Sequence, residues 1–357
     1  MISKEFFKAL EVLSIERQIE KEKVLEIFGR GLINAYKKAY DGKTNVEVIF
    51  NEEKAEILLV ARSLVVAEIS LDAEIGSQML LVDAKNIKKS AKIGDTIEQK
   101  ITPKNFGRLA ASSAKQILTQ GLKQLERERN FEIFTEKTGD MIIAEVIRVN
   151  DEFVTLNLGY ETETSIPAKD LLPEDVFLGN QIRVYITKVE ETTKGPKVYV
   201  SRTDRNLVKR LMENAIPELQ TGVIEIRGLA RDAGDRCKVC VASNNPEVDP
   251  VGACLGKNGS RIKDVIDNLN GEKIDIFKYS SNPKELVSNS LQPAKTVLVQ
   301  VNEMKKSALV VVPDDQLSLA IGKKGQNARL AVQSCGWKID IKSESDAEIQ
   351  GIEVDSE

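Results

Sequence analysis

Two short glycine loops carry the residues with the most recognisable chemistry in this chain of 357 residues. They read Gly256-Lys257-Asn258-Gly259 and Gly322-Lys323-Lys324-Gly325. Glycine lets a backbone approach a ligand closely and adopt positive φ, and a helix that follows offers free N–H groups to a phosphate. The lysines between the glycines add mobile positive charge. The loops therefore predict binding to a phosphate backbone.

The two loops belong to an internal repeat. They are 66 residues apart, and the segments that close each copy, Lys273-Ile274-Asp275-Ile276 and Lys338-Ile339-Asp340-Ile341, are 65 apart. A spacing held to within one residue indicates two copies of one domain. A single GxxG sequence could equally be a tight turn between helices, but the repetition favours the domain. A Walker-type nucleotide loop is excluded, because GxxxxGK[ST] is absent.

The elements around each loop follow one order. Asp249-Pro250 predicts the start of a short helix before the first loop, Asp314 and Asp315 precede the second, and a longer amphipathic helix follows each loop. A helix–GxxG–helix arrangement between strands is the KH module, which binds single-stranded nucleic acid. The candidate RNA-binding residues are Gly256, Lys257, Asn258, Gly259, Arg261 and Lys263 in the first copy, and Gly322, Lys323, Lys324, Gly325, Gln326, Asn327 and Arg329 in the second.

An all-β segment precedes the repeat. Strand-like runs lie at residues 141–149, 153–158, 161–166, 181–189 and 197–201, which suits a small Greek-key barrel of the OB type. Alternation places Val154, Leu156, Leu158, Ile182, Val184, Ile186, Val198 and Val200 inside. The opposite parity carries Phe153, Arg183, Tyr185 and Tyr199, which predict a stacking platform for unpaired bases. The alternative is that these side chains only cover hydrophobic surface.

The N-terminal segment reads as an α+β domain of roughly 100 residues. Residues 3–40 have helical periodicity, strand-like runs follow at 46–50, 57–60 and 64–69, and a short helix is expected near 83–89. Thr102-Pro103 then predicts the start of a long helix that ends near Asn130. We interpret it as a connector, and a dimerising coiled coil is the alternative.

Composition limits the class of function. The formal charge of −4 is the sum of −3 over residues 1–204, +5 over residues 205–342 and −6 over residues 343–357. A basic block before an acidic end suits a surface that binds polyanions. The chain has no histidine. It therefore lacks the commonest general base and zinc ligand, which argues against an enzyme.

The remaining features indicate a cytoplasmic protein. No apolar run approaches about 20 residues, and the charged start Met1-Ile2-Ser3-Lys4-Glu5 is unlike a signal peptide. Cys237 and Cys240 have the CxxC spacing of a metal or redox site but lie in a strand-like run. Residues three apart in a strand face opposite sides, so we expect no metal site and reduced, buried thiols.

The repeat also resembles a known family. Residues 249–261 and residues 320–331, the latter followed by Gly336-Trp337, resemble the KH signatures of the NusA family of bacterial transcription termination/antitermination proteins. The resemblance implies an α+β multidomain protein: an N-terminal α+β domain with a long connecting helix, an S1-type OB β-barrel, and two tandem type II KH domains. It further implies binding to RNA polymerase, to nascent single-stranded RNA and to other elongation or antitermination factors. Such a monomer, without cofactor or catalytic residues, would modulate pausing, termination and antitermination.

The expected domains are residues 1–132, the polymerase-binding domain with its helix; 133–203, the S1 domain; 204–279 and 280–345, the KH domains; and 346–357, an acidic tail. Two other classes combine S1 and KH modules. An RNA-processing enzyme would need clustered carboxylates for Mg²⁺, which the first 136 residues do not show. A ribosome-associated factor would use the same RNA-binding modules.

Overall fold

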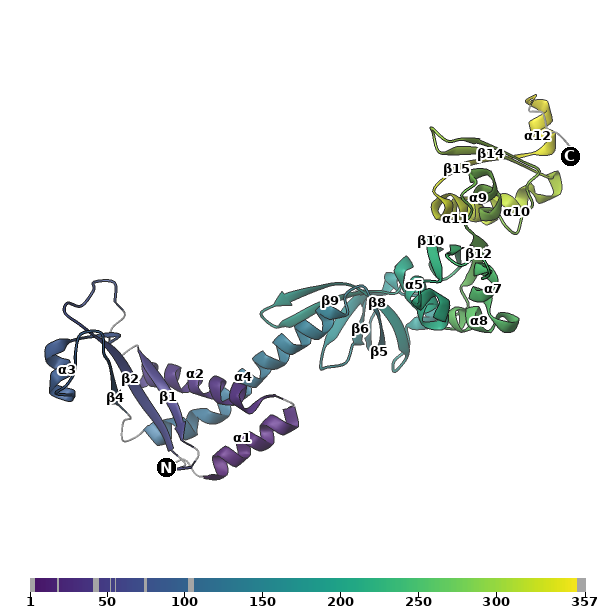
Figure 1. Ribbon diagram of the computed structural model, residues 1–357. Coiled ribbons are helices and arrows are strands. Elements are labelled where there is room, and N and C mark those ends of the chain that lie inside the picture. Colours follow the sequence, from purple (N-terminus) through teal and green to yellow (C-terminus); the bar gives the residue numbers. More distant parts are fainter. Residues whose placement is uncertain are drawn as a thin grey trace. The chain divides into compact units, whose positions relative to one another are not determined.

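The structure is a computed structural model that describes residues 4–17, 19–40, 45–51, 53–54, 56–73, 76–101 and 106–351. The chain divides into two compact units, an N-terminal unit of residues 1–129 and a C-terminal unit of residues 130–357 (Figure 1). Both units combine helices with sheets, as expected for the α+β class. Among the described residues, no helix is both long enough and apolar enough to cross a membrane.

The N-terminal unit packs helices against a four-stranded sheet. Its elements are α1 (Lys4–Arg17), α2 (Lys21–Tyr40), β1 (Val46–Asn51), β2 (Glu56–Val66), β3 (Gln78–Leu80), α3 (Leu81–Ile87), β4 (Thr96–Lys100) and most of α4 (Phe106–Glu136). β2 is antiparallel to β1 and β4 and parallel to β3. Phe28, Leu32 and Leu59 are fully buried in its core.

One long strand replaces two of the expected ones. The runs expected at 57–60 and 64–69 form the single strand β2, because inward side chains continue without a break through Ala61, Ser63 and Val65. Ser63 is polar but donates a hydrogen bond to the carbonyl of Gly76, so its burial is tolerated. Arg62 faces outward and pairs with Glu47 and Glu98 on the neighbouring strands.

The long helix α4 ends later than expected. Its predicted start at Thr102-Pro103 lies outside the described residues, and it continues to Glu136 rather than stopping near Asn130. The extension has a packing reason, since Phe134 is 1% exposed and lies in the core of the β-barrel that follows. Asn130 also donates a hydrogen bond to the carbonyl of Tyr160 in the barrel.

The predicted five-stranded barrel is present. Its strands are β5 (Met141–Val149), β6 (Phe153–Asn157), β7 (Glu163–Pro167), β8 (Gln181–Thr192) and β9 (Gly195–Ser201), in the order β7-β6-β5-β8-β9. The hydroxyl of Thr164 on β7 donates to the carbonyl of Val198 on β9 at 2.6 Å, which nearly closes the barrel. The side chains predicted to face inward all lie in or against the barrel core, so this part of the prediction is confirmed.

The repeat folds as two similar KH domains. The first contains α5 (Arg205–Ala215), α6 (Pro217–Gln220), β10 (Ile224–Asp232), β11 (Arg236–Ser243), α7 (Pro250–Leu255), α8 (Ser260–Asp267) and β12 (Lys273–Lys278). The second contains α9 (Pro283–Ser290), β13 (Leu298–Asn302), β14 (Ser307–Val312), α10 (Leu317–Ile321), α11 (Gln326–Cys335), β15 (Lys338–Ser343) and α12 (Glu344–Ile349). In each, the middle strand pairs with an antiparallel and a parallel neighbour, as in the type II arrangement.

The two KH domains share packing across the sheet of the first. Cys237 belongs to the core of the first domain, whereas Cys240 and Phe277 lie in the core cluster of the second. The two thiols therefore face opposite sides of β11, as the strand pattern predicted. Burial raises the pKa of the Cys240 thiol to about 12, so it remains protonated at neutral pH.

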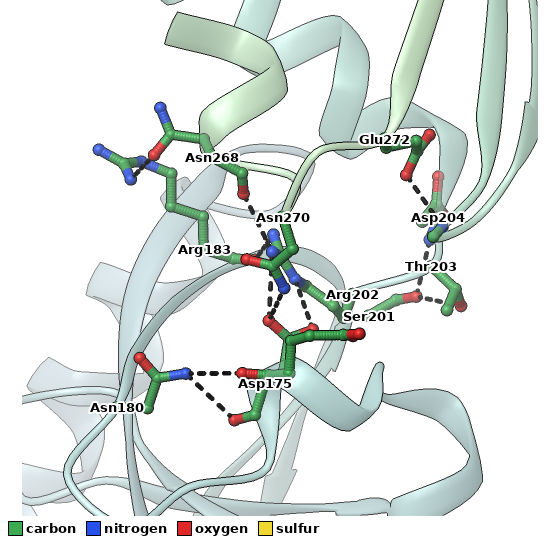
Figure 2. Close-up of polar contacts among 12 residues, drawn as sticks. Asp175, Asn180, Arg183, Ser201, Arg202, Thr203, Asp204, Asn268, Asn270 and Glu272 are labelled. Atoms are coloured by element: carbon green, nitrogen blue, oxygen red, sulfur yellow. Dashed lines mark hydrogen bonds and ion pairs between the residues drawn. The ribbon is translucent and has the colours of Figure 1, made fainter.

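A buried ion pair joins the S1 barrel to the first KH domain. Arg202 and Asp175 are 2% and 1% exposed, and the Arg202 Nε donates to the Asp175 Oδ2 at 3.0 Å. Figure 2 shows Asn268 and Asn270 of the KH domain beside this pair. The Nη2 of Arg202 donates to the carbonyl of Asn268, and the Nδ2 of Asn270 donates to Asp175. Both charges thus have hydrogen-bond partners in both domains.

Replacing Arg202 with methionine should destabilise the S1 barrel by about 3–5 kcal/mol, because Asp175 would remain charged and buried without its partner. Native-state hydrogen exchange of barrel peptides would measure the loss. The control is Arg148→Met, which breaks the exposed pair with Glu163 and should cost less than about 1 kcal/mol. Adding Asp175→Leu to Arg202→Met should restore part of the stability, and equal losses at Arg148 and Arg202 would contradict this role.

Candidate nucleic-acid interface

The first glycine of each GxxG loop has a conformation that only glycine adopts readily. Gly256 has φ 71° and ψ 178°, and Gly322 has φ 76° and ψ 170°. A Cβ atom at Gly256 would lie 2.7 Å from the Cγ of Arg261, and one at Gly322 would lie 2.7 Å from the backbone nitrogen of Asn327. The first glycines therefore set the shape of the loop and its close contact with the following helix.

The second glycine of each loop faces open space. Gly259 and Gly325 are left-handed, with φ 73° and 75°, and a Cβ atom at either would meet nothing within 4 Å. Asn258 and Lys324 just before them are left-handed too. α8 and α11 begin at the next residue, so their N-terminal N–H groups lie beside an unobstructed surface. A phosphate could reach these groups without displacing any side chain.

Two predicted contact residues also make hydrogen bonds within the protein. The Nη1 of Arg261 donates to Glu218 and to the carbonyl of Ala253, each at 2.8 Å. Asn327 is only 3% exposed, and its Nδ2 donates to the carbonyls of Leu291 and Ala320 at 3.1 and 3.0 Å. Both side chains therefore support the loops, and their contact with RNA stays a prediction.

Two more predicted residues connect the KH domains. The Nε2 of Gln326 donates to Asp232 and Asp235 at 2.8 Å, and Arg329 pairs with Asp232 at 2.7 Å. Both aspartates lie at the turn between β10 and β11 in the first KH domain. The second loop is therefore tied to the first domain, and these two side chains position it.

The lysines of the loops remain available to a ligand. Lys257, Lys263, Lys323 and Lys324 are exposed and have no ion pair among the described residues. The residues just before the first glycines, Leu255 and Ile321, were missed by sequence reasoning. They are 39% and 37% exposed and give each loop an apolar neighbour on which a base could rest. Their equal position in the two repeats was the signal that could have found them.

The four barrel residues lie in two places, and their binding of RNA stays a prediction. β5 lies between β6 and β8, which separates Phe153 from Arg183 and Tyr185. Arg183 donates to the side-chain oxygen of Asn268, and Tyr185 packs against the core of the first KH domain. The alternation of side chains along β8 correctly placed Arg183 and Tyr185 on the outer face of the barrel. The first KH domain covers that part of the outer face.

Tyr199 lies instead in a groove of about 1070 Å³ on the outer face of the barrel. Its ring is 4.8 Å from the Nζ of Lys197, and its hydroxyl donates to Glu190 at 2.7 Å. Hydrogen bonds from Lys188 and Tyr199 lower the pKa of Glu190, which keeps it ionised as an acceptor. Phe153 is 46% exposed at the rim, where it pairs with Pro167 of the groove.

Basic residues that sequence reasoning missed also line this groove. They are Arg148, Lys194 and Lys197, and hydroxyl groups of Thr155, Ser165, Thr187, Ser201 and Thr203 accompany them. Lys197 shares the parity of Tyr199 on β9, and Arg148 pairs with Thr155 across β5 and β6. Glu163 and Asp170 also line the groove, and Glu163 pairs with Arg148 at 3.7 Å, so Lys194 and Lys197 supply most of its positive charge. The groove still combines an aromatic face, lysines and hydrogen-bonding hydroxyls, which suits single-stranded nucleic acid.

Replacing Gly259 or Gly325 with aspartate should weaken RNA binding at least about tenfold, because a carboxylate would face the phosphate site. The nearly isosteric asparagine variants are the matched controls. Asp and Asn tolerate left-handed backbone better than most residue types and to a similar degree, so the Asp and Asn variants should have the same melting temperature as each other. RNA titration at one stated salt concentration would compare them, and equal affinities of the Asp and Asn variants would place the RNA elsewhere.

Comparison with known proteins gives a consistent result over the whole chain. Residues 5–128 match the NusA N-terminal domain, residues 135–201 the S1 RNA binding domain, residues 202–279 the NusA-like first KH domain, and residues 283–349 the NusA-like second KH domain.

Relatives in three bacteria are similar along nearly their full length. The transcription termination/antitermination protein NusA of Halalkalibacterium halodurans is 45% identical over 98% of this chain and 91% of its own. That of Bacillus subtilis is 44% identical over 98% and 94%, and that of Thermus thermophilus is 35% identical over 99% and 92%. With its N-terminal domain, S1 barrel and paired KH loops in the same order, the chain belongs to the NusA family of transcription termination/antitermination proteins.

Proposed function

We propose that the chain is an RNA-binding transcription elongation factor that binds RNA polymerase and nascent single-stranded RNA, and so modulates pausing, termination and antitermination in the cytoplasm. The observation that carries the proposal is the open second glycine in both KH loops, each followed by a helix N-terminus. Two similar loops, each with an open glycine, in one unit suit a continuous strand better than a small ligand. Binding of RNA and polymerase requires no catalysed reaction, so we propose no catalytic residue and no cofactor.

The RNA contacts that we propose in the KH domains are the loop backbones and their free side chains. These are Gly256, Lys257, Asn258, Gly259 and Lys263 in the first domain, and Gly322, Lys323, Lys324 and Gly325 in the second. Lysine suits this task because its flexible ammonium group can follow a phosphate without fixed geometry. Arg261, Gln326, Asn327 and Arg329 act by holding the loops in place.

In the S1 barrel we propose that bases stack on Tyr199 and Phe153 while Arg148, Lys194 and Lys197 contact the backbone. The support is their placement in and beside one groove. We do not propose Arg183 and Tyr185 as RNA contacts, because both side chains contact the first KH domain.

The N-terminal unit offers a surface suited to a protein partner. Large apolar side chains between residues 64 and 93 are exposed, among them Ile69, Leu71, Val82, Ile87 and Ile93, at 45–104%. Exposed apolar groups of this size concentrate at protein–protein interfaces. We therefore propose that this part of the N-terminal unit, around α3, binds RNA polymerase, as the family resemblance implies.

If a base stacks on Phe153, removing the ring should weaken RNA binding by the energy of one stacked base. Phe153→Ala should weaken binding of single-stranded RNA by about 1–3 kcal/mol, the usual contribution of one stacked base. Phe177→Ala is the matched control, because Phe177 is an exposed phenylalanine of the same domain, at 64%, that neither lines the groove nor pairs with a strand residue that does. RNA titration with both variants would decide, and equal effects would make Phe153 an ordinary surface residue.

Polymerase binding is tested by retention of the full chain on immobilised RNA polymerase. Leu71→Ser combined with Val82→Ser should reduce retention at least about tenfold, because both side chains would leave an apolar contact. Met304→Ser is the control, since Met304 is an apolar side chain of the second KH domain that is 98% exposed. Retention unchanged by the double variant would exclude this surface, and no retention of the original chain would refute the proposed function.

A further inference from the structure

A second polar pocket lies between the KH domains, away from both glycine loops. Its volume is about 360 Å³, and three segments line it: the first turns of α5, the middle of β10 and the last turn of α11. The second glycine loop precedes the opposite end of α11, at Gln326, so this pocket is a separate feature.

The pocket is positively charged. Arg205, Lys209 and Arg227 line it and are exposed, and none of its lining residues within the described chain is an aspartate or glutamate. Arg227 pairs with Glu225 at 2.7 Å, and the Nζ of Lys209 is 3.9 Å from Glu213. Those two carboxylates offset part of the charge at the pocket edge, whereas Arg205 has no ion-pair partner among the described residues.

Arg205 is unusual for an arginine of this region. Residues 205–342, all of which the structure describes, contain seven arginines. Six of them pair with a carboxylate at 2.7–2.9 Å, namely Arg210, Arg227, Arg231, Arg236, Arg261 and Arg329. Because a guanidinium group usually finds a planar anionic partner, the one left unpaired beside a cavity points to a ligand from outside the chain.

The local backbone is shaped to form this pocket. A β-bulge between Ile226 and Gly228 inserts Arg227 into β10, which is an edge strand and has unpaired backbone groups on its outer side. A Cβ atom at Gly228 would lie 1.9 Å from the carbonyl oxygen of Ser334. This close approach brings the end of α11 over the pocket, so the site requires both KH domains in their packed arrangement.

The pocket lies next to the barrel groove along the chain. Ser201 and Thr203 line the end of the groove, and Arg205 begins the pocket two residues later in the chain. We infer that Arg205, Lys209 and Arg227 bind a phosphodiester group of the RNA strand where it leaves the S1 groove. The inference rests on the proposed function, since it requires RNA in that groove. It adds a phosphate site that depends on neither glycine loop.

The test compares two double variants of the full chain that remove the same charge. Arg205→Gln with Lys209→Gln removes two cations from the pocket, while Lys284→Gln with Lys305→Gln removes two exposed lysines of the second KH domain that line neither site. The probe is a single-stranded oligouridylate of about 20 nucleotides, titrated at several salt concentrations. The pocket variant should bind about tenfold more weakly than the control, with a salt slope lower by about 0.7, the value for one lost phosphate contact on a single strand.

The failures of the two proposals are distinguishable. If the pocket and control variants lose affinity equally while Gly259→Asp still weakens binding, the pocket is not a phosphate site but the proposed function stands. If the original chain does not bind the oligouridylate at all, the proposed function fails, and the pocket site fails with it.

Discussion

The buried pair of Arg202 and Asp175 is the constraint on which the RNA surface depends. Arg202 lies between the end of β9 and the start of α5, so it belongs to the connection between the barrel and the first KH domain. Its guanidinium donates to Asp175 and to the carbonyls of Arg183 and Asn268, and Arg231 donates to the carbonyl of Arg202 (Figure 2). A buried charge is tolerated only when each donor has a partner, so the barrel and the KH domain are held in one relative position. The groove of the barrel and the pocket beside α5 and β10 therefore keep one relative position.

A buried lysine with a hydrogen-bond partner in the other domain likewise holds the two KH domains together. Lys238 is fully buried on β11, and its Nζ donates to the carbonyl of Gln292 in the second domain at 2.8 Å. Burial lowers the pKa of Lys238 to about 8, because the ammonium group has lost its water, while Asp275 at 3.8 Å acts in the opposite direction. Together with the contact between Gly228 and Ser334, this bond fixes the second loop relative to the first. A strand of RNA that contacts both loops therefore meets a preformed spacing and does not have to order the domains.

Sequence reasoning succeeded where one residue type had one physical use. The glycine loops were found because positive φ and close approach demand glycine, and repetition excluded coincidence. It failed where a side chain had several possible partners. Alternation placed Arg183 and Tyr185 on the outer face correctly, but it contains no information on strand order or on which domain covers that face. Likewise the spacing of Asn327 put it beside the loop, whereas only packing shows that its amide turns inward.

The division of labour between arginine and lysine explains how a chain of net charge −4 can present a surface for RNA. Most arginines of the KH region pair with carboxylates within the protein, and Arg231 makes the two-pronged contact with Glu272 that a planar guanidinium group favours. These pairs cancel in the net charge and contribute little to the field outside. The exposed lysines of the loops are left as the effective positive charge, close to backbone N–H groups that add to it. The net charge therefore does not indicate which surface binds RNA. The ion pairs of the individual arginines are more informative, and Arg205 is the arginine of residues 205–342 without such a pair.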